Sequence, residues 1–145
     1  MTATPPSAIK VAGELRTVFS RLRRRFREVA DTGDLTPSQT SVLSRLSKNG
    51  PATATELAAA ERVRPQSMTA TLAAIEQHGY LRRTPDPHDG RRQLISLSAA
   101  GVDLVEGTRR EREEWMAAAL ASDFTEDERQ TILTALVLLD RLAEK

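Results

Sequence analysis

The stretch that decides the fold is LRRTPDPHDGRRQLISLSAAG, residues 81–101. Its outer parts, 81–84 and 91–97, are predicted to form strands, because apolar residues alternate there with polar ones. The part between them, 85–90, holds two prolines and ends in glycine, which favours a loop. The stretch therefore predicts a two-stranded β-hairpin with a basic tip.

The tip of this hairpin carries its charge. Arg91 and Arg92 follow the loop, and exposed arginines suit insertion into a narrow DNA minor groove, where the negative potential is enhanced. Asp89, two residues before Arg91, can hold that guanidinium in a charge-assisted pair. A charged hairpin that only keeps the protein soluble is the alternative, and the segments before the hairpin favour DNA binding.

Two helices joined by a short turn precede the hairpin. Thr53-Ala54-Thr55-Glu56 predicts a capping box and a short helix to about Glu61. Arg62-Val63-Arg64 forms a tight connection, and Pro65 begins a second helix that Gly79 ends. With the hairpin, this order makes a winged helix-turn-helix. An ordinary helix hairpin fits the two helices alone equally well, and the basic hairpin after them shifts the balance toward DNA.

The second helix has one apolar side and one small or polar side. Met68, Leu72 and Ile75 fall on the first, which must pack on the preceding helix. The other side must stay small or polar if the helix is to enter a major groove about 12 Å wide. The alanines at positions 70, 73 and 74 permit close approach and can touch thymine methyls. The polar candidates for DNA contact are Gln66, Ser67, Thr69 and Thr71.

The segment before the helix-turn-helix predicts two further helices. Apolar residues recur in steps of three and four over residues 7–30, which indicates an amphipathic helix. Thr36-Pro37-Ser38-Gln39 predicts the start of the next helix with a capping box, and Asn49-Gly50-Pro51 ends it. The opposite face of the first helix carries five arginines: Arg21, Arg23, Arg24, Arg25 and Arg27.

Two more helices are predicted after the hairpin. Ser98 caps a long helix to about Ala121, in which 109–114 predicts a solvated face with ion pairs three and four residues apart. Thr125-Glu126-Asp127-Glu128 starts the last helix with three acids at the positive end of its dipole. Apolar residues cover more than one face of this last helix, which indicates a partner surface. A central helix buried within the monomer fits the same pattern equally well.

The whole chain of 145 residues has the length of one domain and contains no cysteine. Disulfides, thiolate metal sites and thiol switches are therefore excluded, which fits a reducing compartment. No apolar run is long enough to span a bilayer and the N-terminal segment has no signal-peptide pattern, so we expect a cytoplasmic protein without a membrane partner. Residues 1–100 carry 15 basic and 9 acidic side chains, a net +6, and residues 101–145 carry 6 and 11, a net −5. A polyanion is thus expected to face the first part.

Enzymatic chemistry finds little support in the sequence. His78 and His88 are the only histidines, and neither has a second ligand at metal-binding spacing. No credible catalytic triad and no phosphate-cradling glycine loop is present. Trp115 and Met116 fit core packing better than a ligand cavity. We therefore expect no enzyme, with no catalytic residue, metal or cofactor.

Taken together, these motifs resemble the MarR family of bacterial regulators over nearly the whole chain. The likeness rests above all on Asp86-Pro87-His88-Asp89-Gly90-Arg91-Arg92, followed by Ile95-Ser96-Leu97-Ser98 and Gly101. It extends to parts of 35–46, 56–58, 63–68 and 72–81. The wing motif at a fixed distance from its Leu-Ser-x-x-Gly continuation is specific, whereas each helix motif alone is not.

The resemblance implies a mainly α fold with a small two-stranded β wing in a single domain, residues 1–145. The winged helix-turn-helix would occupy 35–97 and bind DNA, and helices in 1–34 and 98–145 would form a homodimer. Two positions depart from the family pattern. Arg64 stands where a small capping residue is common and is expected to reach a phosphate; Ala70 stands where an arginine is common.

We therefore expect a sequence-specific regulator of transcription that binds double-stranded DNA, a repressor acting as a homodimer on a pseudo-palindromic operator. Family members often respond to small aromatic acids, so release by such a ligand is a further expectation, although the sequence names no effector. The alternative function is a helical protein-interaction adaptor that does not bind DNA. The expected DNA-contacting residues are Arg64, Gln66, Ser67, Thr69, Thr71, Asp89, Arg91 and Arg92, with Arg91 at the wing tip. The residues considered for a ligand pocket are Arg21, Arg25, Trp115 and Met116.

Overall fold

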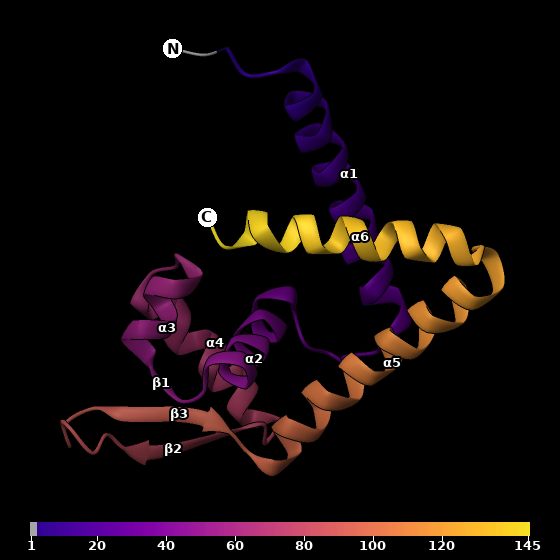
Figure 1. Cartoon of the computed structure of the whole chain (residues 1–145). Coiled ribbons are helices and arrows are strands. Elements are labelled where there is room, and N and C mark those ends of the chain that lie inside the picture. Colours follow the sequence, from indigo (N-terminus) through magenta and orange to yellow (C-terminus); the bar gives the residue numbers. More distant parts are fainter. Residues whose placement is uncertain (1–2) are drawn as a thin grey trace.

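The computed structural model describes residues 3–145 and is mainly helical, with one small antiparallel sheet (Figure 1). Its helices and strands follow the predicted order, with one strand added. The elements are α1 Pro6–Val29, α2 Pro37–Asn49, β1 Ala52–Thr53, α3 Ala54–Glu61, α4 Pro65–Gln77, β2 Leu81–Pro85, β3 Gln93–Leu97, α5 Ala99–Asp123 and α6 Glu126–Ala143.

Helix starts are where the sequence predicted them. At α2 the Thr36 hydroxyl accepts from the Gln39 backbone N–H at 3.2 Å, and the Gln39 side chain accepts from the Thr36 N–H at 3.0 Å. The same reciprocal pair joins Thr125 and Glu128 at α6. Because such a box satisfies two backbone donors within four residues, it fixes the first turn locally.

The capping box predicted for α3 is only half formed. The Thr53 hydroxyl accepts from the Glu56 backbone N–H at 3.2 Å, but no bond returns from the Glu56 side chain to the Thr53 N–H. Thr53 belongs to β1, which pairs with β3, so its backbone is drawn into the sheet. The helix still begins where it was predicted to begin.

The sheet has three strands in the order β1-β3-β2, whereas the sequence predicted two. In the added pairing Ala52 lies opposite Ile95 and Thr53 opposite Leu94. Two residues beside a proline carry no readable alternation, which explains why this strand was not predicted. The second hairpin strand was also expected to begin at Arg91, but it begins at Gln93, because Arg91 and Arg92 belong to the turn.

The core lies in the lobe formed by α2, α3, α4 and the sheet. Met68, Leu72 and Ile75 of α4 are buried, as the helical spacing predicted, and they share one cluster with Leu43 of α2 and Ile95 of β3. Arg45 of α2 fastens α3 to this core from outside through a 2.8 Å ion pair with Glu61, whose carboxylate also accepts from the Ser41 hydroxyl. The two helices before α4 are thus held firmly together.

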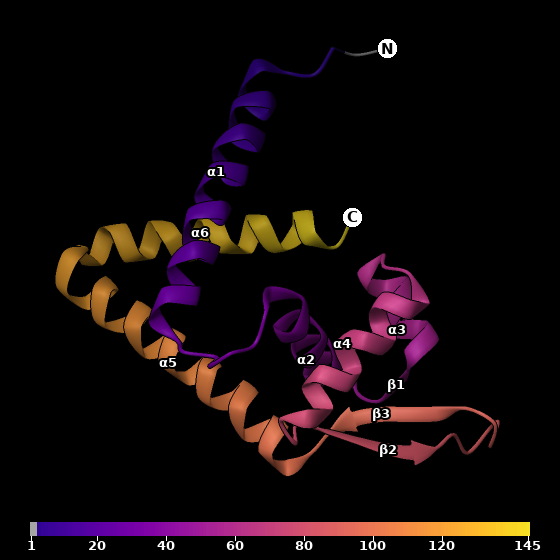
Figure 2. The same cartoon turned by 180° about the vertical axis from the view of Figure 1, so that it is seen from behind.

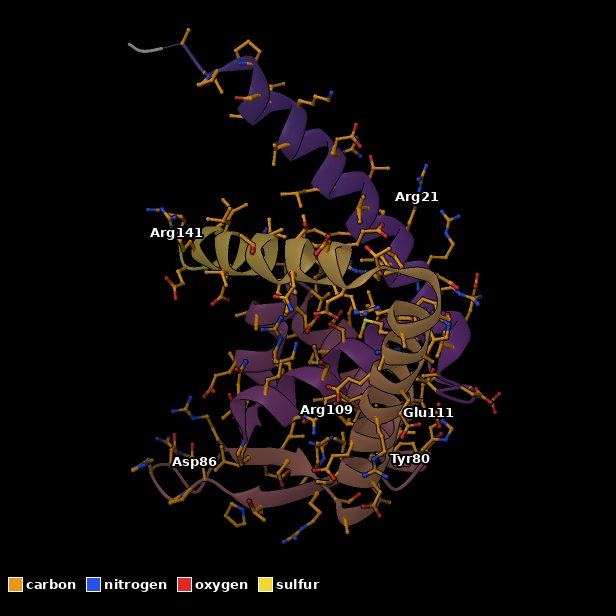
Figure 3. All side chains as sticks on the ribbon, turned by 45° about the vertical axis from the view of Figure 1, so that its right-hand side comes forward. Arg21, Tyr80, Asp86, Arg109, Glu111 and Arg141 are labelled. Carbon is orange, nitrogen blue, oxygen red and sulfur yellow. The ribbon has the colours of Figure 1, made fainter. Side chains whose placement is uncertain are left out.

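A tight joint connects the sheet to α5. The Ser98 N–H donates to the Tyr80 carbonyl at 2.9 Å, and the Ser98 hydroxyl donates to the Gly79 carbonyl at 2.6 Å while it caps Gly101. Gly101 is buried, and a Cβ there would collide with the Tyr80 carbonyl oxygen. Figure 3 shows Tyr80 at this end of the hairpin and Asp86 at the opposite, loop end.

Outside the lobe, α5 leads away to a corner from which α6 turns back, and the N-terminal part of α1 projects beyond α6 (Figures 1 and 2). Neither α1 nor α6 contains a residue that is fully buried in the monomer. Across residues 3–145, no helix is long and apolar enough to cross a membrane.

The end of α1 rests on the middle of α5. The Arg112 guanidinium donates to the Phe26 carbonyl at 3.1 Å, and Trp115 meets Phe26 edge to face with ring centroids 6.3 Å apart. Arg25 lies over the Trp115 ring at 5.3 Å. Burial lowers the pKa of Arg112 below its usual value. None of the ion pairs predicted within 109–114 forms, and Arg112 of this segment is bonded to α1.

Candidate nucleic-acid interface

The turn between α3 and α4 sets the direction of α4. Arg62 has φ +56°, the left-handed conformation, and its N–H donates to the Ala59 carbonyl at 3.2 Å. The Val63 N–H donates to the Ala58 carbonyl at 3.0 Å. This pair of bonds is the Schellman motif, which ends α3 and lets the chain reverse within three residues. Arg64 follows in extended conformation, immediately before α4, and its side chain is exposed.

The outward face of α4 is small and polar. Gln66, Ser67 and Thr69 are exposed, as are the two alanines that follow at 70 and 73. Thr71 differs from its expected neighbours, since it is half-buried and its hydroxyl donates to the Ser67 carbonyl at 3.0 Å. The Thr69 hydroxyl likewise donates to the Pro65 carbonyl at 3.0 Å.

The wing turn is organised by one carboxylate. Asp89 accepts from the Arg91 backbone N–H at 3.1 Å and pairs with the Arg91 Nε at 3.3 Å and the Arg92 Nε at 3.5 Å. The turn is closed by bonds from the Asp86 N–H to the Arg92 carbonyl and from the Arg92 N–H to the Asp89 carbonyl. The Arg91 side chain is 92% exposed, so it projects into solvent from a fixed base.

The structure therefore forms two groups from the predicted residues. Asp89, Arg91 and Arg92 meet in the wing turn, and Gln66, Ser67 and Thr69 share the outer face of α4. Within the described residues, no hydrogen bond or ion pair joins the two groups. Two further exposed arginines of the same turn and hairpin, Arg62 and Arg82, were not predicted as DNA contacts. The sequence signal that could have indicated them as DNA contacts is that both lie in basic segments, the turn before α4 and the hairpin.

Comparison with known proteins shows to which family this helix-turn-helix and wing belong. The MarR family model matches residues 35–92, which run from the start of the lobe to the end of the wing turn. The HTH-type transcriptional regulator Mb0904 of Mycobacterium bovis is 37% identical over 139 residues, 96% of each chain. The chain belongs to the MarR family.

Two further regulators of transcription extend the comparison. A crystal structure of a protein from Pseudomonas aeruginosa superposes with a TM-score of 0.86 at 35% identity and covers 98% of this chain and 99% of that one. The HTH-type transcriptional repressor MdtR of Bacillus subtilis is 29% identical over 130 residues, 90% of this chain and 81% of its own. The predicted mainly helical winged helix-turn-helix fold is thus confirmed.

As a MarR regulator, the chain is a DNA-binding regulator of transcription and not an enzyme. This assignment confirms the resemblance and excludes the alternative of an adaptor without DNA binding. In the part of the chain that the structure describes, no three histidine or acidic side chains gather as metal ligands would.

Proposed function

We propose that the protein is a repressor that binds a pseudo-palindromic operator as a homodimer, with 35–97 as the DNA-binding part and 1–34 and 98–145 as the dimerisation part. The single observation that carries the proposal is the apolar surface that α1 and α6 leave uncovered beside a complete winged lobe. The repressor role is supported by the similarity to MdtR, which is named as a repressor.

The uncovered surface is too large for a compact monomer. The chain exposes 11006 Å², whereas a compact monomer of 16.0 kDa exposes about 7,400 Å². The excess is about 3,600 Å² per chain, or about 7,200 Å² for two copies, which is as large as the most extensive obligate dimer interfaces bury in total, about 5,000 Å² and more. We propose that a second copy of the chain, which carries the same uncovered surface, is the partner that covers it.

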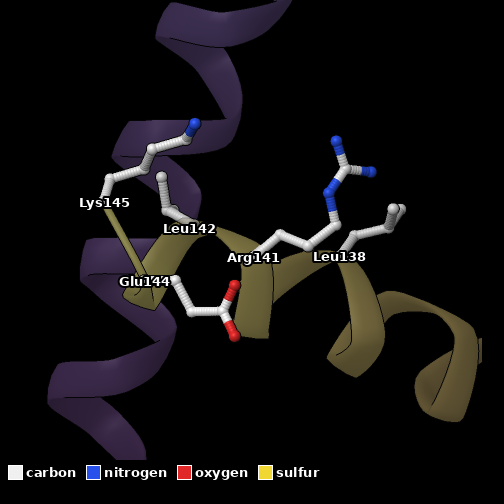
Figure 4. A pocket seen from close by; sticks show the side chains of 5 residues that line it. All are labelled: Leu138, Arg141, Leu142, Glu144 and Lys145. Atoms are coloured by element: carbon white, nitrogen blue, oxygen red, sulfur yellow. The ribbon is translucent and has the colours of Figure 1, made fainter.

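The residues behind this excess are concentrated on the two outer helices. Val137 of α6 is 66% exposed and Phe19 of α1 is 54% exposed, values at which large apolar side chains need a partner. At the end of α6, Leu138 and Leu142 lie among the charged side chains of Arg141, Glu144 and Lys145 (Figure 4). The exposed large apolar residues of these helices are Ile9, Val11, Val18, Phe19, Leu22, Leu133, Leu136, Val137, Leu138 and Leu142.

A symmetric pair of lobes fits a symmetric operator. Dimers of this type place two recognition helices in successive major grooves, about 34–36 Å or 10 base pairs apart. In each lobe we assign the major groove to Gln66, Ser67, Thr69 and Thr71 on α4. Arg64, at the start of α4, is assigned to a phosphate. Arg91 and Arg92, held by Asp89, are assigned to the adjacent minor groove.

We further propose that a small aromatic ligand releases the operator. The contact of α1 with α5 supports this step, because cationic Arg25 and Arg112 flank the Phe26 and Trp115 rings there. A ligand with a ring and a carboxylate would compete for these partners. Titration of the DNA complex with a panel of aromatic acids tests it; no release by any acid at millimolar concentration would refute this step alone.

The test of the main proposal uses the full chain and duplexes from the region upstream of its own gene. Binding should saturate at one dimer per duplex, and log K should fall linearly with log salt as phosphate counterions are released. A promoter overlapped by the bound duplex should be silenced in a reporter strain. A one-to-one complex of monomer and duplex, or affinity that is weak and flat with salt, would overturn the proposal.

A further inference from the structure

The outer face of α4 carries no positive charge. Among its thirteen residues only Glu76 is charged, and its carboxylate is paired with Arg83 of β2 at 3.0 Å. Arginine and lysine are the side chains that bind the O6 and N7 acceptors of guanine in the major groove. The helix therefore lacks the usual means of selecting G·C pairs.

The hydrogen-bond donors on this face are few. Thr69 and Thr71 have committed their hydroxyl hydrogens to the carbonyls of Pro65 and Ser67. In the first turn this leaves the Gln66 amide and the Ser67 hydroxyl, both exposed. A glutamine amide offers one donor and one acceptor side by side, which matches N7 and N6 of adenine.

The rest of the face is apolar and small. Ala70 and Ala73 are exposed, and they follow Gln66 at steps of four and three, along one side of the helix. A methyl group on this line can meet the C5-methyl of thymine, the apolar mark of the major groove. In the wing, the exposed Arg91 suits the narrow minor groove of A-tracts.

We propose that the operator half-site is rich in A·T pairs, with Gln66 on an adenine, Ala70 and Ala73 on thymine methyls, and Arg91 in an adjoining narrow minor groove. This inference rests on the proposed operator binding and names the class of sequence that α4 selects. Arg64 lies outside the helix, and its contact with a phosphate leaves the base composition unaffected.

The experiment begins with selection of bound duplexes from a random pool by the full chain. The enriched half-sites should be A·T-rich at the positions facing α4. Base analogues then test the contacts with the unaltered protein. Replacing the contacted adenine by 7-deazaadenine should weaken binding about 5- to 150-fold. Replacing each contacted thymine by uracil should weaken it about 4-fold.

Variants assign the effects to residues. Gln66→Ala should lose its sensitivity to 7-deazaadenine, and Gln77→Ala, the same change at the other end of α4, should keep it. Inosine·cytosine pairs, which present an A·T-like minor groove, should be tolerated at the Arg91 position where guanine·cytosine pairs are not.

The outcomes separate the two proposals. If no duplex is enriched, operator binding itself fails. If the enriched half-sites place guanines opposite α4, and 7-deazaguanine there weakens binding, the protein binds DNA but the inference is wrong. A guanine preference that disappears in Arg64→Ala would move base selection from α4 to the turn, and would also overturn it.

Discussion

The Arg91 side chain makes few contacts with the rest of the protein. Its only side-chain partner in the described chain is Asp89, and 92% of the side chain is exposed. Arg91→Ala should therefore leave stability unchanged and weaken operator binding by roughly 1–3 kcal/mol, the value of one good groove contact. Fluorescence anisotropy at fixed salt measures the loss. Arg110→Ala, an exposed arginine on α5, is the matched control and should bind as the parent does.

Arg62 bears a conformational cost that glycine would not. At φ +56° a side chain meets the backbone, and a left-handed residue other than glycine costs roughly 1 kcal/mol. Arg62→Gly should raise the free energy of unfolding by about 0.5–1 kcal/mol in urea at fixed protein concentration. Arg64→Gly, at φ −69°, should bring no such gain. A loss of stability in Arg62→Gly would contradict this account of the turn.

The sequence predicted only part of the candidate site, the part that follows from helical periodicity. Helical spacing places Met68 inside and Gln66 outside, because periodicity alone decides which face is buried. Arg62 has no such signature, since an arginine gives no sign that its backbone is left-handed. The hydrogen bond from the Thr71 hydroxyl to the Ser67 carbonyl could not be predicted from the sequence either, because it depends on the side-chain conformation within the helix.

At the scale of elements, the joint between β3 and α5 depends on a missing side chain. A Cβ on Gly101 would collide with the Tyr80 carbonyl, which is backbone and cannot swing aside. Gly101→Ala should destabilise the protein by about 1–3 kcal/mol, as overpacking does. Gly107→Ala is the matched control on the same helix. No atom lies within 4 Å of its added Cβ, so it should stabilise by roughly 0.5–1 kcal/mol in the same thermal or urea unfolding experiment.

The first turn of α6 depends on pH. A backbone bond from Thr125 lowers the pKa of Glu128, and bonds from Gln130 and Arg129 lower that of Glu126. Because both values are depressed on folding, this stabilisation is present above the ordinary glutamate pKa and is lost as pH falls through the folded values. Mild acid should therefore fray α6 before it unfolds the lobe.

Glu128→Gln isolates this effect. Glutamine keeps the capping box, as Gln39 does in α2, but does not titrate. Helix content followed by circular dichroism from pH 6 to pH 3 should fall less in this variant than in the parent. An equal fall in both proteins would exclude Glu128 as a source of the acid sensitivity.

Elements with local signals were predicted well. The starts of α2, α3, α5 and α6 each have a serine or threonine whose hydroxyl accepts from the backbone N–H three residues later, and four residues of sequence contain both partners. The strand β1 was missed because its pairing with β3 joins residues some forty positions apart. Arg91 and Arg92 were assigned to a strand because the bonds that close the wing turn leave no mark in composition.

For the whole molecule, the decisive question is how the outer helices are covered. Val137→Glu places a charge in the centre of the exposed α6 face and should yield monomers with greatly reduced operator affinity. Sedimentation velocity gives the mass. Val102→Glu, the same change at an exposed valine near the start of α5, should stay dimeric. A dimeric Val137→Glu would place the interface elsewhere.

The sequence also showed surplus apolar residues on the last helix, but it left a buried central helix equally open. Only the three-dimensional arrangement separates the two, since α6 has no fully buried residue in the monomer. Periodicity alone cannot tell an apolar helix face that is buried within one chain from a face that is exposed in the monomer and would be covered only in a dimer.

The stiff joint at Gly101 makes α5 a lever. With 25 residues the helix is about 37 Å long, so a tilt of about 5° at one end carries the other through about 3 Å. That displacement is close to one base-pair step along the duplex. In the proposed dimer, a disturbance near Phe26 and Trp115 would thus be magnified into a mismatch between the spacing of the two lobes and the spacing of the grooves that they are proposed to occupy.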